Sequence, residues 1–377
     1  MVNRERITEE FMRQAAISSP SLKESAMAQY LEKRFAGMGA EVVYDVAAGR
    51  VGGEVSNLIA RFPGSRDGEP FLFSVHMDTV VPCDHVEPVL VDGVVRTAGE
   101  TVLGADDKAG IAELIEALEV VREQGIEHAP LEVVVTIGEE IGLVGAKHLD
   151  YSLVRSKRGI ALDTPGVDWI VRRAPGANRF EVTVYGQAAQ AGVAPEKGVS
   201  AIEVAARAVA RMRLGRIDFE TTANIGTING GLATNIVAEK VILSGEARSH
   251  DAEKLADQTA HMLACFEEAA DEMVREIDGT VVRASIKSEV RPDFPRMAVA
   301  ADAAIVDLAN RAAANIGREM RDRLGGGGSD ANIFNENGIE MVIIGTGMQN
   351  VHSTDEEVAV ADLMAVAEFL VEVIREA

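Results

Sequence analysis

The sequence predicts an α/β fold, an open and mostly parallel sheet with helices on both faces, interrupted by a second domain. Three observations favour this fold. Apolar runs rich in β-branched residues alternate with amphipathic stretches, the runs are short enough to be buried strands, and the pattern changes beyond Pro175. With 377 residues the chain is long enough for two domains and a large core.

The first pattern occupies both ends of the chain. A helix pair is expected within residues 7–38, broken at residues 18–21 by serines and a proline. The elements expected next are strands at 41–45, 57–62, 71–76, 131–138 and 159–163, a helix at 108–123, and, after Pro295, a helix at 298–316, a strand at 341–344 and a helix from Asp362. We therefore expect one domain made of residues 1–177 and 291–377.

Residues 178–290 follow a different pattern. Alternation at 180–185 predicts a half-exposed strand. A helix at 200–213, strands at 224–229 and 236–248, a helix at 252–277 and a strand at 280–287 complete the segment. The order strand-helix-strand-strand-helix-strand is the split βαβ arrangement of a ferredoxin-like α+β domain. We expect this segment to be an inserted domain.

Composition excludes some classes of partner. The formal net charge is −23, and binding to phosphate groups needs clustered Lys and Arg, so we expect neither nucleic acid nor a membrane as partner. No run approaches the ~20 apolar residues of a membrane span, and the first twenty residues have no apolar signal core. Cys83 and Cys265 are too few for a disulfide framework or a cysteine zinc cluster. A cytoplasmic location is expected.

Acidic and imidazole side chains stand where the predicted strands end. Singly, each is explained as well by a capped strand end, a helix N-cap or an acidic loop. Together they would meet at the edge where open α/β sheets bind ligands. The residues are His76, Asp78, Asp106, Glu139, Glu140, Asp163 and His352. This set predicts a hydrolytic site with two metal ions.

The charges of such a site balance. Three ligand carboxylates and one hydroxide neutralise two divalent ions, which leaves one further acid to move protons. Two ions ~3.5–4 Å apart can lower the pKa of a shared water toward ~7. Nitrogen and oxygen ligands without thiolate suit zinc best, with cobalt or manganese as alternatives.

Five sequence runs carry a resemblance to a known family. HMDTV, GADDKAGIA, GEEIGLVGAKHLD, ALD and GTGMQNVHS resemble the metal-site motifs of the co-catalytic dizinc exopeptidases, which include peptidase T (tripeptidase), the glutamate carboxypeptidases and the aminoacylases. The similarity extends over nearly the whole chain and looks closest to the peptidase T-like branch. It implies a zinc-exopeptidase-like catalytic domain and a lid and dimerisation domain at 178–290.

The resemblance also implies a role for each residue of the set. Asp106 would bridge the metals, with His76 and Asp163 on one ion and Glu140 and His352 on the other. Family members have a cis peptide bond after the bridging Asp, here Asp106–Asp107.

Two acids would act beside the metals. Glu139 would be the general base that deprotonates the water and then protonates the leaving amine. Asp78 would orient His76, as carboxylates do for imidazoles bound to metal.

Substrate-binding residues are implied in two places. Asn235 and Arg248 match positions that hold the terminal carboxylate of the substrate, and Gly327 and Gly328 could offer backbone N–H groups to it. A solvated Arg on a strand and flexible loop glycines are the alternative interpretations.

One position departs from the family. The lid normally carries a histidine that donates to the developing oxyanion, and Gln190 stands there in this chain. A glutamine amide donates a hydrogen bond but cannot be a cation, so we expect weaker stabilisation of that charge.

The expected function is hydrolysis of short peptides by an aminopeptidase or tripeptidase. An N-acyl amino acid hydrolase, a dipeptidase or a carboxypeptidase of the same family is the alternative. Because of Gln190, a weakly active or non-catalytic homologue that binds metal and peptide is a second alternative, although an intact Glu139 argues against it. A homodimer through the lid domain is the assembly we expect.

Overall fold

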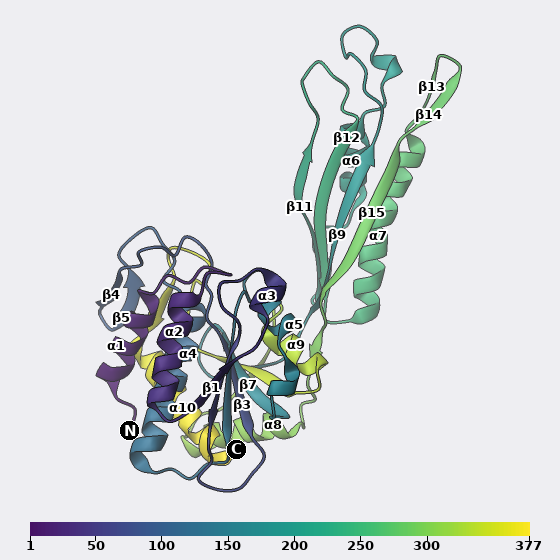
Figure 1. Ribbon diagram of the computed structural model, residues 1–377. Coiled ribbons are helices and arrows are strands. Elements are labelled where there is room, and N and C mark those ends of the chain that lie inside the picture. Colours follow the sequence, from purple (N-terminus) through teal and green to yellow (C-terminus); the bar gives the residue numbers. More distant parts are fainter. The chain divides into compact units, whose positions relative to one another are not determined.

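The computed structural model describes residues 1–377 and divides into two units (Figure 1). Unit 1 comprises Met1–Ala174 and Met297–Ala377, and unit 2 comprises Pro175–Arg296. The divisions therefore fall at 174/175 and 296/297, whereas the sequence analysis placed them at 177/178 and 290/291.

Unit 1 is built on a mixed nine-stranded sheet. The strands lie in the order β1 (Glu41–Tyr44), β2 (Leu58–Phe62), β6 (Leu131–Thr136), β3 (Phe71–His76), β7 (Arg158–Thr164), β18 (Glu340–Gly345), β8 (Trp169–Ala174) and β16 (Met297–Ala298), with β17 (Arg321–Leu324) beside β8. The four central strands, from β6 to β18, are parallel, whereas β1, β2 and β16 pair antiparallel with their neighbours. The predicted parallel sheet is thus present at the centre, and the flanks make the whole sheet mixed.

Helices cover both faces of this sheet. β3 and β6 are buried at every position, which requires cover on both sides. The long helices of unit 1 are α1 (Arg4–Ala15), α2 (Ser25–Gly37), α4 (Ala105–Gln124), α8 (Ala304–Asn315) and α10 (Val360–Glu376). α4 contacts β3, β7, α1 and α10 and is buried along most of its length.

Shorter elements complete unit 1. The short helices are α3 (Ala48–Val51), α5 (Val144–His148), η1 (Tyr151–Leu153) and α9 (Asp330–Glu336). A second, antiparallel sheet contains β19 (Glu357–Ala359), β5 (Val94–Thr97) and β4 (Pro88–Val91).

Unit 2 is an antiparallel sheet with helices on one face. The strand order is β10 (Gly215–Arg216), β11 (Thr221–Gly230), β12 (Lys240–Ser249), β9 (Gly176–Tyr185) and β15 (Ser285–Phe294). α6 (Ala201–Arg211) and α7 (Ala252–Glu272) share one core with alternate residues of the strands, and η2 (Pro195–Lys197) precedes α6. The predicted order strand-helix-strand-strand-helix-strand is present as β9, α6, β11, β12, α7 and β15.

Two expectations for unit 2 were wrong in detail. α7 ends at Glu272 rather than at 277, because a hairpin of β13 (Val274–Ile277) and β14 (Thr280–Arg283) turns at Asp278 and Gly279, both with positive φ. The strand expected at 280–287 is divided between β14 and β15, and β15 continues past Pro292, because it is an edge strand with a register shift there, where a proline need not donate to the sheet.

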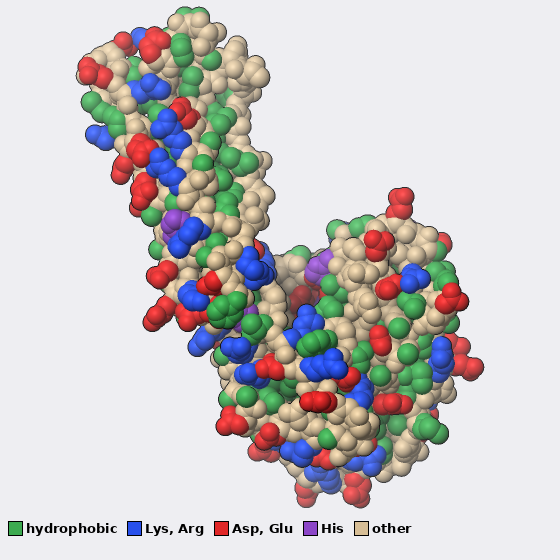
Figure 2. All heavy atoms as spheres, turned by 180° about the vertical axis from the view of Figure 1, so that it is seen from behind, with side chains coloured by type: hydrophobic (Ala, Val, Ile, Leu, Met, Phe, Trp, Pro, Cys, Tyr) green, Lys and Arg blue, Asp and Glu red, His purple; other side chains and the backbone are tan.

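None of the helices is long and apolar enough to cross a membrane. Figure 2 shows acidic and basic side chains interspersed on the face in view, without a large patch of basic side chains.

Gly159 tests the packing of the central strands. A Cβ at Gly159 in β7 would lie 2.4 Å from the Leu72 carbonyl oxygen of β3, a backbone atom that cannot move aside cheaply. We expect Gly159→Ala to lower the free energy of unfolding by about 1–3 kcal/mol, the usual range for overpacking. The measurement is the midpoint of urea unfolding.

Gly37→Ala is the matched control. Gly37 ends α2, and a Cβ there would meet nothing within 4 Å. This change should raise stability by up to about 1 kcal/mol, because alanine loses less backbone entropy than glycine in a helix. Equal midpoints for the two variants would contradict the strand packing described here.

Candidate metal centre

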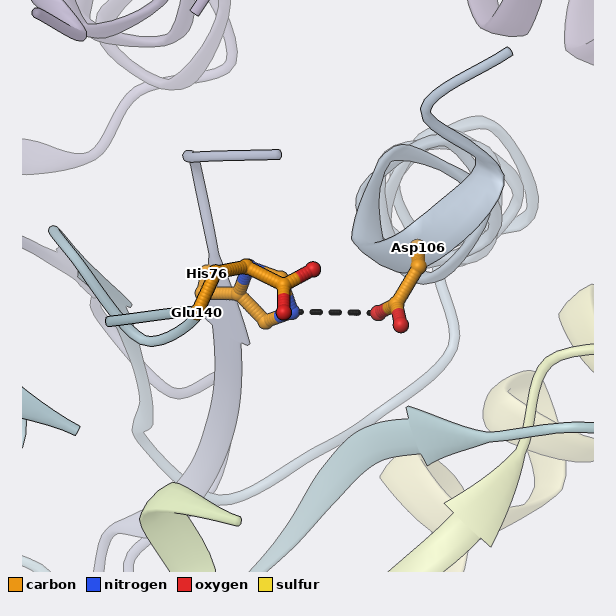
Figure 3. Close-up of side chains that lie close together, drawn as sticks. All are labelled: His76, Asp106 and Glu140. Atoms are coloured by element: carbon orange, nitrogen blue, oxygen red, sulfur yellow. Dashed lines mark hydrogen bonds and ion pairs between the residues drawn. The ribbon is translucent and has the colours of Figure 1, made fainter. Parts of the chain in front are cut away.

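Five side chains meet at the carboxyl edge of the central strands of unit 1. His76 is the last residue of β3, Asp163 lies near the end of β7, and Glu140 follows β6. Asp106 stands at the start of α4, and His352 lies in the loop between β18 and β19. Because the central strands are parallel, their carboxyl ends share one edge. Figure 3 shows His76 and Glu140 beside each other and facing Asp106.

Asp106 lies between two imidazoles. Its Oδ1 is 3.1 Å from His76 Nε2, and its Oδ2 is 3.3 Å from His352 Nε2. His352 Nε2 is also 3.0 Å from Glu140, and His76 Nε2 is 3.9 Å from Asp163 Oδ1. One carboxylate thus faces two pairs, each of one imidazole and one further carboxylate. The Asp106–Asp107 peptide bond is cis, as the resemblance implied.

The donor set fits divalent metal ions. Ligand atoms of His76, Asp106 and Glu140 all lie within 4.8 Å of one another. Two imidazole nitrogens and three carboxylates, without thiolate, are donors that suit zinc, cobalt or manganese. The five residues proposed as ligands from the sequence are therefore close together, and Asp106 is placed to share its two oxygens.

Without metal, the cluster holds protons. Hydrogen bonds to Asp106 and Glu140 raise the pKa of His352 to about 10, and contacts with Asp106 and Asp78 raise that of His76 although burial opposes it. Burial, aided by Asp106, raises the pKa of Asp163 to about 8. Both imidazoles and Asp163 therefore carry protons at neutral pH.

Asp78 holds the turn that follows β6. The Asp78 carboxylate is fully buried; Oδ1 accepts from the backbone N–H of Glu139 at 3.0 Å, and Oδ2 accepts from that of Glu140 at 3.2 Å. His76 Nδ1 is 3.0 Å from the backbone oxygen of Asp78 and 3.4 Å from its Oδ1. The sequence analysis expected Asp78 to orient His76. In the structure, its carboxylate makes its closer contacts with the turn that carries both glutamates.

Glu139 is half-buried beside the cluster. Burial raises the pKa of its carboxyl well above the usual value, and the charge of Asp163 adds to this shift. A nearby cation would favour the ionised form. Glu139 is thus a group whose protonation responds to what occupies the site.

Several polar contacts at the cluster were missed from the sequence. Ser329 favours ionised Asp163, and Asp330 accepts from the Thr136 hydroxyl. Glu356 is buried and accepts from the backbone N–H of Gly104 at 2.7 Å and of Asp106 at 3.0 Å. Two features of the sequence could have indicated these contacts. Ser329 and Asp330 directly follow a run of four glycines, and Glu356 lies four residues after His352.

Gly327 and Gly328 lie in unit 1, in the loop between β17 and α9 that leads to Ser329. Gly328 directly precedes Ser329, the residue that favours ionised Asp163.

Gln190 and Asn235 lie on neighbouring loops of unit 2. The backbone N–H of Ala191 donates to the backbone oxygen of Asn235 at 2.9 Å, and Gln190 pairs with Ile236 in an isolated antiparallel β-bridge. Gln190 Oε1 accepts from the backbone N–H of Gly192 at 2.6 Å. Because its oxygen is used in this way, the amide NH₂ is the end left to donate.

Arg248 lies at the other end of unit 2. Its guanidinium donates to Glu246 at 2.9 and 3.0 Å and stacks over Phe294, with 5.9 Å to the ring centroid. β12 extends from Lys240, beside the Gln190 loop, to the residue after Arg248, so the two ends are about 25 Å apart. The structure does not bring Arg248 together with Gln190 and Asn235.

Comparison with known proteins identifies relatives over the full chain. The model of Peptidase family M20/M25/M40 matches residues 72–376. The chain is 41% identical to the uncharacterized protein YqjE of Bacillus subtilis, with 100% of both chains covered. It is similar to the crystal structure of aminopeptidase PepT from Bacillus cereus, with 42% identity, a TM-score of 0.90 and 100% and 99% of the chains covered. A tripeptidase from Staphylococcus aureus matches with 37% identity, a TM-score of 0.93 and 100% and 98% coverage.

Metal binding should release protons. Because His76 and His352 carry protons at pH 7 without metal, loading the site should release at least one proton from each imidazole. Raising the pH removes the competing protons, so metal affinity should rise up to about pH 10, and fewer protons should be released per chain above about pH 8, the pKa of Asp163, and again above about pH 10, that of His352. Titration calorimetry in buffers of different ionisation enthalpy measures both quantities.

His128→Ala, outside the cluster, is the control and should release as many protons as the unaltered chain. Binding without proton release at pH 7 would contradict protonated imidazoles in the metal-free centre.

Proposed function

Because this chain belongs to Peptidase family M20/M25/M40, we propose that it is a dinuclear zinc exopeptidase that removes single residues from short peptides. The observation that carries the proposal is the position of Asp106 between two imidazole–carboxylate pairs, with Glu139 beside them. Its full-length likeness to an aminopeptidase and to a tripeptidase supports a peptidase T-like activity.

Each residue of the cluster has a part in this proposal. Asp106 would hold both metal ions, His76 and Asp163 one of them, and Glu140 and His352 the other. The ions, once bound, would supply positive charge to polarise the scissile carbonyl and to acidify a shared water.

Glu139 would move the proton. It would accept the proton of the attacking water and deliver it to the leaving amine. Burial raises the pKa of its carboxyl in the metal-free protein, and bound cations would favour the ionised form that a base needs. Asp78 would keep Glu139 and Glu140 in place through their backbone N–H groups.

The alternatives differ in substrate rather than in bond chemistry. The same cluster can hydrolyse an N-acyl amino acid or a dipeptide, since each reaction is attack of water on an amide. A panel of di- and tripeptides and N-acetyl amino acids, tested with zinc, cobalt and manganese, distinguishes these activities. Turnover of none of them would favour a binding protein. A cytoplasmic location is part of the proposal and agrees with the free thiols of Cys83 and Cys265.

We propose a homodimer in which unit 2 of one copy serves the metal centre of the other. Asn235 and Arg248 were expected to hold one carboxylate, but about 25 Å separates the two ends of β12 near which they lie. Within one chain they cannot contact the same small substrate. A second copy would supply Gln190 and Asn235 where the first supplies Arg248. β11 supports such pairing, because beyond its short contact with β10 its outer edge is exposed.

The two adjacent glutamates should separate base from ligand. Glu139→Gln should remove turnover and leave two metal ions per chain, because an amide cannot take up the water proton. Glu140→Gln should lose metal, because an amide is a poorer ligand than a carboxylate. Elemental analysis of metal-loaded protein and peptide hydrolysis measure the two effects. Loss of metal in Glu139→Gln with activity kept in Glu140→Gln would reverse the roles.

Mixed dimers test Gln190 and the partner copy together. Gln190→Ala should lower kcat by about 10²-fold, the usual cost of one oxyanion donor, with KM little changed, and Gln190→His should raise kcat. A tagged Gln190→Ala chain co-purified with a Glu139→Gln chain should regain activity, because one site then has both Glu139 and the partner's amide.

The control for the mixed dimer is a pair of Glu139→Gln chains with the same two tags. No recovery of activity in the mixed dimer, or the mass of a single chain in light scattering, would refute the proposal that unit 2 of one copy serves the metal centre of the other.

A further inference from the structure

Four successive backbone N–H groups at the metal centre donate to side chains. They follow β6, where the hydrogen bonds of the sheet end, and buried N–H groups need another acceptor there. The pairs are Ile137 with Asn57 Oδ1 at 3.0 Å, Gly138 with Glu24 Oε1 at 3.0 Å, and Glu139 and Glu140 with Asp78 at 3.0 and 3.2 Å. The turn that carries both glutamates is therefore shaped by acceptors from three distant segments.

Glu24 is the contact from the N-terminal segment. It is fully buried directly before α2, and the Oε1 that accepts from Gly138 also accepts from the backbone N–H of Leu22 at 2.7 Å. The same segment reaches Asp78, because the Ser21 hydroxyl donates to Asp78 Oδ2 at 2.7 Å. Ser21 and Glu24 precede residues 72–376, the part of the chain that the family model matches.

Gly138 leaves the turn little freedom. Its φ is +56°, a region that residues with a Cβ rarely adopt, and a Cβ there would lie 2.5 Å from the Val144 side chain. The Gly138 N–H belongs to the peptide that links Ile137 to Gly138, and the orientation of this peptide sets the course of the chain into Glu139. Without an acceptor for the Gly138 N–H, this peptide could rotate, and the carboxylate would move with it.

We infer that Glu24 is a positioning residue for hydrolysis, which holds the Gly138 N–H and thereby directs the carboxylate of Glu139 toward the attacking water. This inference rests on the proposed function. Glu24 touches neither the metal ligands nor the substrate in this role, and it acts only through the backbone of the turn.

A neutral side chain that accepts the same hydrogen bonds should be able to take the place of Glu24. Burial, with a contribution from Asp78, raises the pKa of the Glu24 carboxyl to about 7, so the position tolerates an uncharged group. The amide oxygen of Glu24→Gln can accept from Leu22 and Gly138 as Oε1 does. Glu24→Ala offers no acceptor.

The kinetic test compares these two variants with a matched control. Glu24→Ala should lower kcat about 10²-fold with KM little changed, since a misplacement of about 1 Å typically has that effect, and Glu24→Gln should stay within about threefold of the unaltered enzyme. Glu10 is the control, because it is also buried but bonds to Gln14, Tyr30 and Arg34, away from the metal centre. Glu10→Ala should lower stability and leave kcat unchanged.

A second readout needs no activity. Amide hydrogen exchange of a peptide covering residues 131–143 should be faster in Glu24→Ala than in the unaltered chain, and unchanged in Glu24→Gln and Glu10→Ala. If the protein hydrolyses no substrate, the proposed function fails, and the exchange result still decides whether Glu24 holds the turn.

Two results would overturn the inference. One is unchanged exchange in Glu24→Ala, and the other is an equal loss of kcat in Glu24→Ala and Glu24→Gln. Glu24→Met, which keeps the volume and lacks the acceptor, replaces Glu24→Ala if that variant does not fold.

Discussion

Repulsion among crowded, largely buried or half-buried carboxylates is the constraint on which the centre of this protein depends. Asp106, Asp163, Glu139 and Glu140 lie close together at one edge of the sheet, where burial strengthens their mutual repulsion. Without metal, the imidazoles offset the charge, and their contacts hold the pKa of Asp106 below its usual range although burial opposes this shift. Divalent cations can replace these protons. The same arrangement thus explains an affinity for metal and a carboxyl group able to exchange protons.

The sequence predicted the positions of the proposed ligands better than the surroundings that hold them. His76, Asp163 and Glu140 were found because each follows an apolar run, and such runs become parallel strands with one common carboxyl edge. The roles within the set came from the resemblance, because spacing alone does not separate a ligand from its neighbour. The antiparallel flanks of the sheet were not predicted, since a buried apolar run reads alike in either direction.

Residues that act through the backbone left no comparable signal. Glu24 and Glu356 are acids in loops, and most such acids are solvated. Their burial becomes apparent only when a distant segment brings unpaired N–H groups to them. The hairpin at 274–283 was missed for a related reason, because its first strand continues the apolar spacing of α7 until Asp278 and Gly279 turn the chain.

The insertion of unit 2 has a consequence for folding. β8 and β16 are antiparallel neighbours, yet all of unit 2 lies between them in the sequence, and β18 enters the sheet between β7 and β8. During synthesis, β7 and β8 therefore emerge long before the strand that separates them. The centre of the sheet depends on contacts of large sequence separation, which form slowly and leave strand edges exposed meanwhile. Unit 2 has its own core within one continuous segment and can fold first. Until β18 is made, the exposed edges of β7 and β8 in the N-terminal part of the nascent chain should therefore need protection from aggregation.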